Sequence, residues 1–154
     1  MSVIRLTIRV GLVLVPWPLL AQSTVERHLS VGAANLVAPM VTTGMDAITP
    51  QGLSVGVSGT VVVALFEGPW ALYGGSTRVG FHGRGYSRIQ PFVVGELGYF
   101  RETDCCGGSV IAGINVGVTR WRNQKSAFRI EGRLLLPLAE EGGLVTFQVG
   151  LTFR

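Results

Sequence analysis

The chain has 154 residues, of which 47% are hydrophobic and 14% charged, and it carries 22 glycines and a formal net charge of +4. This length allows a single domain with a sizeable core. No long apolar run follows the first twenty or so residues, which argues against a helical membrane span later in the chain. There is also no basic tract with interleaved aromatic residues, so we expect no nucleic-acid partner.

Residues 1–21 have the pattern of a cleaved secretory signal peptide. Two arginines precede the apolar stretch Val10–Leu20, and a plausible cleavage site follows it. The alternative is a retained membrane anchor. About 12 apolar residues interrupted by Pro16 and Pro18 are too few for a spanning helix, which needs about 20. We therefore expect export, with the folded domain at residues 22–154.

After the leader, the sequence alternates between apolar and polar residues with a period of two, which is typical of β-strands with two different faces. The closing stretch Leu144–Arg154 shows the pattern best. We expect one face of this stretch to contact lipid: Val145, Phe147, Val149, Leu151 and Phe153. Seven strands are readable in chain order: 24–35, 52–66, 71–81, 89–101, 110–119, 128–136 and 144–154. Short strands at regular spacing predict a single all-β domain, either a barrel or a sandwich.

The pattern is lost between Leu36 and Pro50. Pro39 and Pro50 bracket this stretch, and proline cannot donate to a central ladder. Two interpretations stay open here: one long loop, or an irregular additional strand.

Ionisable residues fall on the polar face of several expected strands. They are Arg78, Glu96, Arg129, Glu131 and Arg133. In a membrane barrel these side chains would face the lumen, where a salt-bridge network is the simplest role for them, because an unpaired ion would be costly there. In a soluble barrel they would face water instead. The alternation alone does not separate an outer-membrane barrel from a soluble, lipocalin-like barrel that binds a small apolar ligand.

Four segments together carry a family resemblance: Ser30–Ala34, Ile89–Phe100, Phe128–Arg133 and Val149–Arg154. With the leader, they resemble small bacterial outer-membrane β-barrel proteins, a largely uncharacterised envelope family that is distantly similar to OmpA/OmpX-type barrels. The resemblance implies an antiparallel up-and-down barrel of about eight strands, integral to the outer membrane, with both termini in the periplasm. It also implies outer-membrane lipid, envelope chaperones and the barrel-assembly machinery as partners, and we expect a monomer. The obscure 36–50 region departs from this pattern.

The sequence favours a structural or interaction role with a lumen filled by side chains, without an enzymatic activity or a cofactor. A barrel of about eight strands has room for side chains but not for an aqueous channel. His28 and His82 are the only histidines, and neither belongs to a recognisable catalytic motif. Cys105 and Cys106 are adjacent, and they could form a vicinal disulfide, stay as free thiols or bridge to another chain.

The expected turns separate by charge between the two ends of such a barrel. One end collects the basic stretches 82–88 and 120–125 with Arg154, and Arg101 is the main exception to the pattern. The other end collects acidic residues: Glu67, Glu102, Asp104, Glu140 and Glu141. No metal site is assigned from a motif. One expectation is that these carboxylates bind divalent cations and so bridge to anionic lipid, because hard cations prefer oxygen ligands. The alternative is that they only keep the turns soluble.

Overall fold

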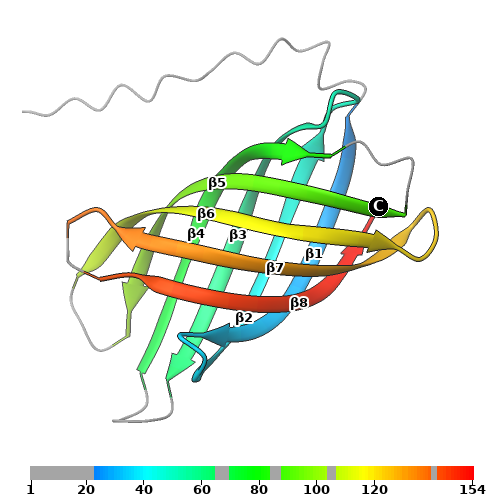
Figure 1. Ribbon diagram of the computed structural model, residues 1–154. Helices are drawn as coiled ribbons and strands as arrows, with labels where there is room; N and C mark the ends of the chain where they lie inside the picture. Colours follow the sequence, from blue (N-terminus) through cyan, green and yellow to red (C-terminus); the bar gives the residue numbers. More distant parts are fainter. Residues whose placement is uncertain (1–22, 65–69, 84–87, 104–106, 140–141) are drawn as a thin grey trace, which may run out of the picture.

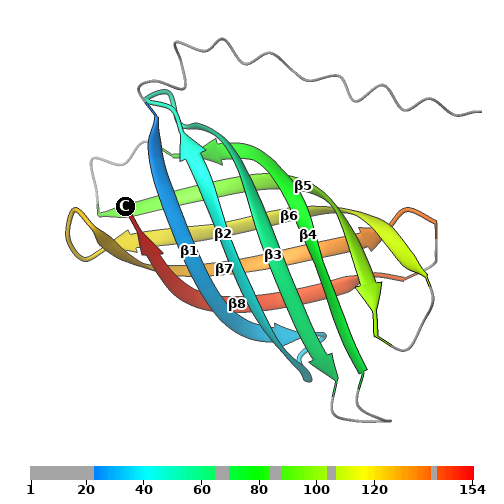
Figure 2. The same cartoon turned by 180° about the vertical axis from the view of Figure 1, so that it is seen from behind.

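The computed structural model describes residues 23–64, 70–83, 88–103, 107–139 and 142–154, and these form eight antiparallel strands. Each strand pairs with the next one in the chain, and β1 pairs with β8, so the sheet closes into an up-and-down barrel (Figures 1 and 2). The strands are β1 Thr24–Ala34, β2 Ala38–Ile48, β3 Leu53–Ala64, β4 Trp70–His82, β5 Ile89–Glu102, β6 Gly108–Trp121, β7 Ser126–Pro137 and β8 Leu144–Phe153. The expectation of an antiparallel barrel of about eight strands is confirmed.

The obscure stretch between Leu36 and Pro50 contains strand β2, and the loop interpretation was wrong. Strand β2 tolerates Pro39 because it pairs with β3 only from Met40 onward, so Pro39 lies before the doubly paired part of the strand.

A tight turn precedes β2. Asn35 and Leu36 both adopt positive φ there, at 46° and 66°. Asn35 secures the turn by accepting a hydrogen bond from Val145 N–H on its Oδ1 atom, at 3.0 Å.

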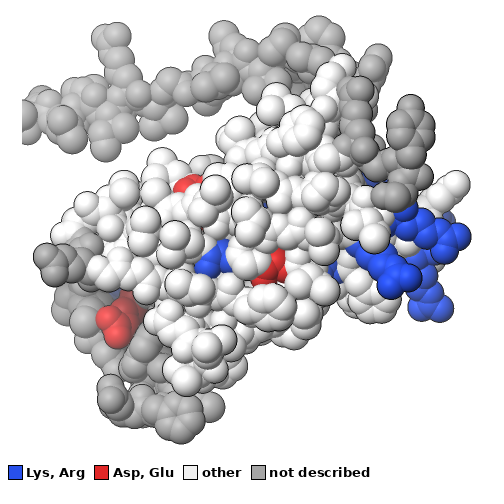
Figure 3. Space-filling view, in the orientation of Figure 1, with Lys and Arg blue, Asp and Glu red and all other residues white. Residues whose placement is uncertain are grey.

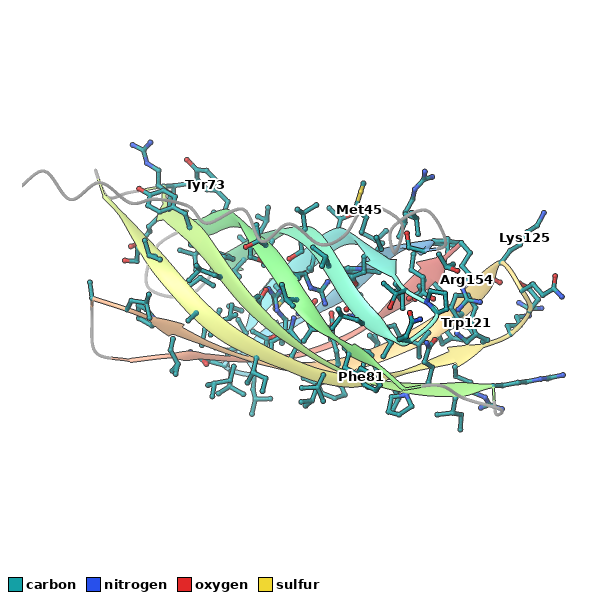
Figure 4. All side chains as sticks on the ribbon, turned by 90° about the horizontal axis from the view of Figure 1, so that it is seen from above. Met45, Tyr73, Phe81, Trp121, Lys125 and Arg154 are labelled. Carbon is teal, nitrogen blue, oxygen red and sulfur yellow. The ribbon has the colours of Figure 1, made fainter. Side chains whose placement is uncertain are left out.

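Apolar side chains cover the outside of the barrel and polar side chains fill much of the inside. On β8, Val145, Phe147 and Val149 are exposed, whereas Thr146 and Gln148 are buried. The same parity holds on the other strands, and Figure 4 shows Met45 and Phe81 projecting from the outer surface. This arrangement is the inverse of a soluble barrel and matches a barrel whose outer solvent is lipid.

The two ends of the barrel are defined by the termini. We call the end with Thr24 and Phe153 the terminal end, and the opposite one the far end. Strands β2, β4 and β6 finish at the terminal end, whereas β1, β3, β5 and β7 finish at the far end (Figure 1). Every connection is three to six residues long. Within the described residues, no helix is long and apolar enough to cross a membrane.

Several expected turn boundaries shift by one or two residues. Gly108 and Trp121, which lie outside the expected strand 110–119, belong to β6. His82 is a clearer correction, because we grouped it with the exposed basic turns, yet it ends β4 with its side chain buried in the lumen. The alternation of inward and outward side chains on β4 therefore extends to the last residue of the strand.

Candidate functional site

A layer of polar side chains crosses the middle of the lumen and is organised by Arg133 on β7. The guanidinium donates to both carboxylate oxygens of Glu96 at 2.9–3.1 Å and to Asn115 Oδ1 at 3.1 Å. It also donates to the hydroxyls of Thr42 and Thr60 at 3.0 Å, and these hydroxyls lie 3.1 Å apart. One side chain therefore connects β7 to β2, β3, β5 and β6.

The layer extends to β4 through two serines. Ser76 donates to Glu96 Oε2 at 2.9 Å and is itself 2.8 Å from the hydroxyl of Ser58. We call this set the central polar layer: Thr42, Ser58, Thr60, Ser76, Glu96, Asn115 and Arg133. None of its side chains has a buried polar atom without a hydrogen-bond partner. Such a fully satisfied network holds the strands that it connects in fixed positions across the lumen.

A second charged group lies toward the terminal end. Arg78 Nη1 donates to His28 Nε2 at 2.8 Å and lies 3.5 Å from Asp46 Oδ2. Because arginine can only donate, the accepting Nε2 atom of His28 carries no proton, and the ring proton is assigned to Nδ1. That atom lies 3.7 Å from Asp46 Oδ2. β1, β2 and β4 are thus joined by one histidine, one carboxylate and one guanidinium.

Arg129 and Glu131 form an ion pair within β7. Arg129 Nη2 and Nε donate to Glu131 Oε2 at 2.8 and 3.0 Å. The Arg129 guanidinium also lies over the ring of Phe92, 3.9 Å from its centroid, and Phe92 stacks on His82. The cation is therefore held between a carboxylate and an aromatic face, which compensates in part for its removal from water.

The terminal mouth of the lumen is covered by Arg154. Its guanidinium donates to Glu26 Oε1 at 2.8 and 3.0 Å and lies over the ring of Trp121, 3.8 Å from its centroid. Trp121 in turn donates to Gln90 Oε1 at 3.0 Å. Figure 4 shows Trp121 and Arg154 together at this end, opposite Tyr73. A small cavity of about 250 Å³ opens here, and Glu26, His82 and Arg154 are among its lining residues.

The terminal half of the lumen holds buried polar atoms that have no protein partner among the described residues. They include both ring nitrogens of His82, Glu26 Oε2, Arg78 Nε and the hydroxyl of Thr152. Such atoms are the usual partners of ordered water, because leaving them unsolvated costs about 1–3 kcal/mol each. We therefore expect this half to be hydrated, in contrast to the central polar layer.

The far half of the lumen is apolar. One cluster contains Ala34, Ala38, Met40 and Val62. A second contains Phe100, Ile111 and Leu135, and Leu72 and Leu144 pack against both. Above the second cluster lies an open cavity of about 450 Å³, which we call the far cup. The lumen is thus divided into an apolar far half, a hydrogen-bonded middle and a polar terminal half.

All five ionisable residues singled out in the sequence lie inside the barrel. The exposed fraction is 6% or less for each of them: Arg78, Glu96, Arg129, Glu131 and Arg133. Glu96 is paired with Arg133, whereas the ion-pair partner of Arg78 is Asp46 on β2.

Several other buried polar residues of the lumen were not among the site residues predicted from the sequence. They are Glu26, His28, Asp46, Asn115 and Gln148. Period-two parity marked Asn115 and Gln148 as inward, and an extension of it to Glu26 would have found that residue as well. Asp46 had no such signal, because its strand was not recognised.

The remaining candidate residues are only partly described. Cys105, Cys106, Asp104 and the Glu140–Glu141 pair lie outside the described residues, as does Glu67. Glu102 ends β5 and lines the far cup. Figure 3 shows basic side chains gathered at the terminal end. The described exposed cations there are Arg88, Arg120, Arg122, Lys125 and Arg154, and Arg27 is exposed on the outer face of β1.

Solved structures with the same fold are membrane barrels. Neisserial surface protein A is 12% identical over 84% of this chain and 94% of its own, with a TM-score of 0.66. The N-terminal β-barrel domain of OprF from Pseudomonas aeruginosa is 14% identical over 86% and 96%, with a TM-score of 0.63. The outer-membrane enzyme PagL is 12% identical over 84% and 99%, with a TM-score of 0.56. No family model and no curated protein matches the chain.

These likenesses confirm the resemblance to small outer-membrane barrels at the level of fold. They do not transfer an activity, because the fold is shared by an enzyme and by a surface protein.

Proposed function

We propose that this chain is an integral protein of the bacterial outer membrane, with a structural or interaction role and a sealed lumen. The observation that carries the proposal is the inverted arrangement of side chains. Exposed valine, leucine and phenylalanine cover the outside, whereas ion pairs such as Arg133–Glu96 lie inside. A soluble lipocalin-like barrel would need the opposite arrangement, because its lumen holds the apolar ligand and its outside faces water.

In the proposed role, the barrel does not conduct ions. The central polar layer joins six of the eight strands across the lumen, and its buried polar atoms are satisfied by one another. An ion would have to displace these hydrogen bonds to pass.

The proposed role is also non-catalytic. Both histidines are buried, with His28 at 2% exposure and His82 at 0%. His28 Nε2 accepts a hydrogen bond from Arg78, and the ring is enclosed in the lumen, so it is not available to a substrate in the surrounding membrane. The fold neighbour PagL, named an outer-membrane enzyme, shows that the fold alone does not decide this point.

Outer-membrane lipid is the proposed partner, and the exported chain is proposed to depend on envelope chaperones and the barrel-assembly machinery. A monomer is supported by closure of the sheet, because every described strand is paired on both edges and no edge remains for a second copy.

Two measurements test the proposal. After expression with its leader in a Gram-negative host, the protein should stay in the outer-membrane fraction through carbonate and urea extraction. Release into the soluble fraction would contradict the proposal and favour the lipocalin-like alternative. In planar bilayers, the purified barrel should show no discrete conductance steps under conditions in which a porin does. Reproducible steps would contradict the sealed lumen.

A further inference from the structure

The far cup is a built cavity. Its walls come from five adjacent strands, with Leu72 on β4, Phe100 on β5, Ile111 on β6, Leu135 on β7 and Leu144 on β8. At about 450 Å³, it has the size of a site for one small ligand. These five apolar residues lie on the inward faces of their strands, so the lipid that surrounds the barrel does not account for the apolar wall.

The floor of the cup is shaped by glycines. On β4, β5 and β6, an inward glycine separates the apolar residue from the central polar layer: Gly74, Gly98 and Gly113 respectively. A Cβ atom at Gly74 would lie 2.7 Å from the Phe100 ring, and one at Gly113 would lie 2.6 Å from Leu135 Cδ2. The missing side chains thus make room for Phe100 and Leu135, which form a dry floor over the polar layer.

The rim of the cup is polar and acidic. Among the described residues that line the cavity, Glu102 is the one ionisable group, and none is lysine or arginine. Glu102 lies two residues beyond Phe100 on the same inward face of β5, at the entrance to the apolar part. A ligand that fits has an apolar chain and a positively charged or hydrogen-bond-donating head.

We propose that the far cup binds a single-chain cationic amphiphile, with the alkyl chain against Phe100, Ile111 and Leu135 and the ammonium head beside Glu102. Binding would bury apolar surface of both the alkyl chain and the cavity wall, and the ammonium head would gain a charge-assisted contact with Glu102. This binding goes beyond the proposed membrane role. The bound amphiphile would stop at the central polar layer, so binding needs no passage through the barrel.

The test uses dodecylamine with a photoreactive diazirine on its terminal carbon, added to the refolded full barrel in phospholipid vesicles, and peptide mass spectrometry locates the label. Neighbouring residues of opposite parity separate cup binding from dissolution in the bilayer. We expect label on Phe100, Ile111 and Leu135 that excess unlabelled dodecylamine displaces. Label confined to the outward neighbours Tyr99, Val110 and Leu134, or label that is not displaced, would overturn the proposal.

Two variants sharpen the result. Leu144→Trp fills the cup and should lower the displaceable inward label about tenfold, which corresponds to about 1.4 kcal/mol, whereas Val145→Trp on the lipid face should leave it unchanged. If Leu144→Trp does not fold, as judged by heat-modifiable migration, Gly107→Trp replaces it, because a Cβ there meets no atom within 4 Å. Equal labelling of the filled and control variants would contradict binding in the cup.

The head-group part of the proposal is tested separately. The same probe with a carboxylate head, a dodecanoic acid, should label the inward residues less than the amine does. Glu102→Gln should remove this preference and leave chain-directed labelling in place. Equal labelling by both probes in the unaltered barrel would refute the role of Glu102. A negative outcome in any of these experiments leaves the extraction and conductance tests of the membrane role unaffected.

Discussion

Replacing Arg133 by methionine should strongly destabilise the barrel. The guanidinium makes six donor contacts of 2.9–3.1 Å to Glu96, Asn115, Thr42 and Thr60. After the change, the two threonines keep each other and Glu96 keeps Ser76, but the carboxylate loses its cation. Leaving one member of a buried ion pair without its partner costs about 3–5 kcal/mol.

The free energy of unfolding can be measured by urea titration of the barrel in lipid vesicles, followed by tryptophan fluorescence. We expect Arg133→Met to lower it by the amount above. Arg120→Met, which removes an exposed arginine on β6, is the matched control and should leave it nearly unchanged.

A double-mutant cycle separates the ion pair from general loss of packing. Glu96→Met alone should also be costly, because it leaves the buried Arg133 guanidinium without a carboxylate. The Glu96→Met/Arg133→Met variant should cost less than the sum of the two single changes, by about 2–3 kcal/mol. A cost below about 1 kcal/mol for Arg133→Met, or simple additivity in the cycle, would refute the interpretation of the layer as a coupled network.

Three further predictions follow from the same geometry. Val149→Arg places a cation on the lipid face of β8 and should lower the free energy of unfolding by about 2–4 kcal/mol if Val149 lies near the bilayer midplane; in the same urea titration, an unchanged midpoint would contradict the outward assignment. Gly44→Ala brings a Cβ to 2.6 Å from Val57 O and 2.7 Å from the His28 ring, so it should cost about 1–3 kcal/mol, and a neutral result would show that this contact relaxes freely. A single cysteine at Gln124, in a background with both native cysteines replaced, should resist a membrane-impermeant thiol reagent in intact cells and react after lysis; labelling of intact cells would place the terminal end outside.

The sequence was most informative where one face of a strand is uniformly apolar. On β8, every second residue from Val145 to Phe153 is outward and apolar, and the inward residues between them are polar or glycine. Lipid on one side and a polar lumen on the other impose that contrast, so period-two alternation was sufficient to place the strand.

Strand β2 was not readable because its two faces do not contrast. Its inward residues begin with Ala38 and Met40, which line the apolar far half of the lumen, and continue to Thr42 and Asp46. Its outward face includes Pro39 as well as valine and threonine. Where the lumen and the lipid are both apolar at the same height along the barrel, apolar and polar residues no longer alternate. The strand is then recognisable only from its pairing with β1 and β3.

The candidate site was predictable as a set of inward charges but not as pairs. Arg78 and Glu96 are direct register partners on β4 and β5, yet their ion-pair partners are Asp46 and Arg133. Long side chains reach across the lumen to strands that are not neighbours, and a linear sequence holds no signal for that choice. The same limit applies to the far cup, whose walls come from five strands.

The most direct test of the inverted barrel is an intermolecular nuclear Overhauser measurement between lipid acyl chains and protein methyl groups. The protein would be deuterated, labelled at the methyls of valine, leucine and isoleucine, and placed in phospholipid nanodiscs without substitutions. We expect cross-peaks to lipid chains from outward residues such as Val57, Val116 and Val149, and none from the inward Val62 and Val94. Cross-peaks from Val62 and Val94 together with silence from the outward methyls would contradict the account.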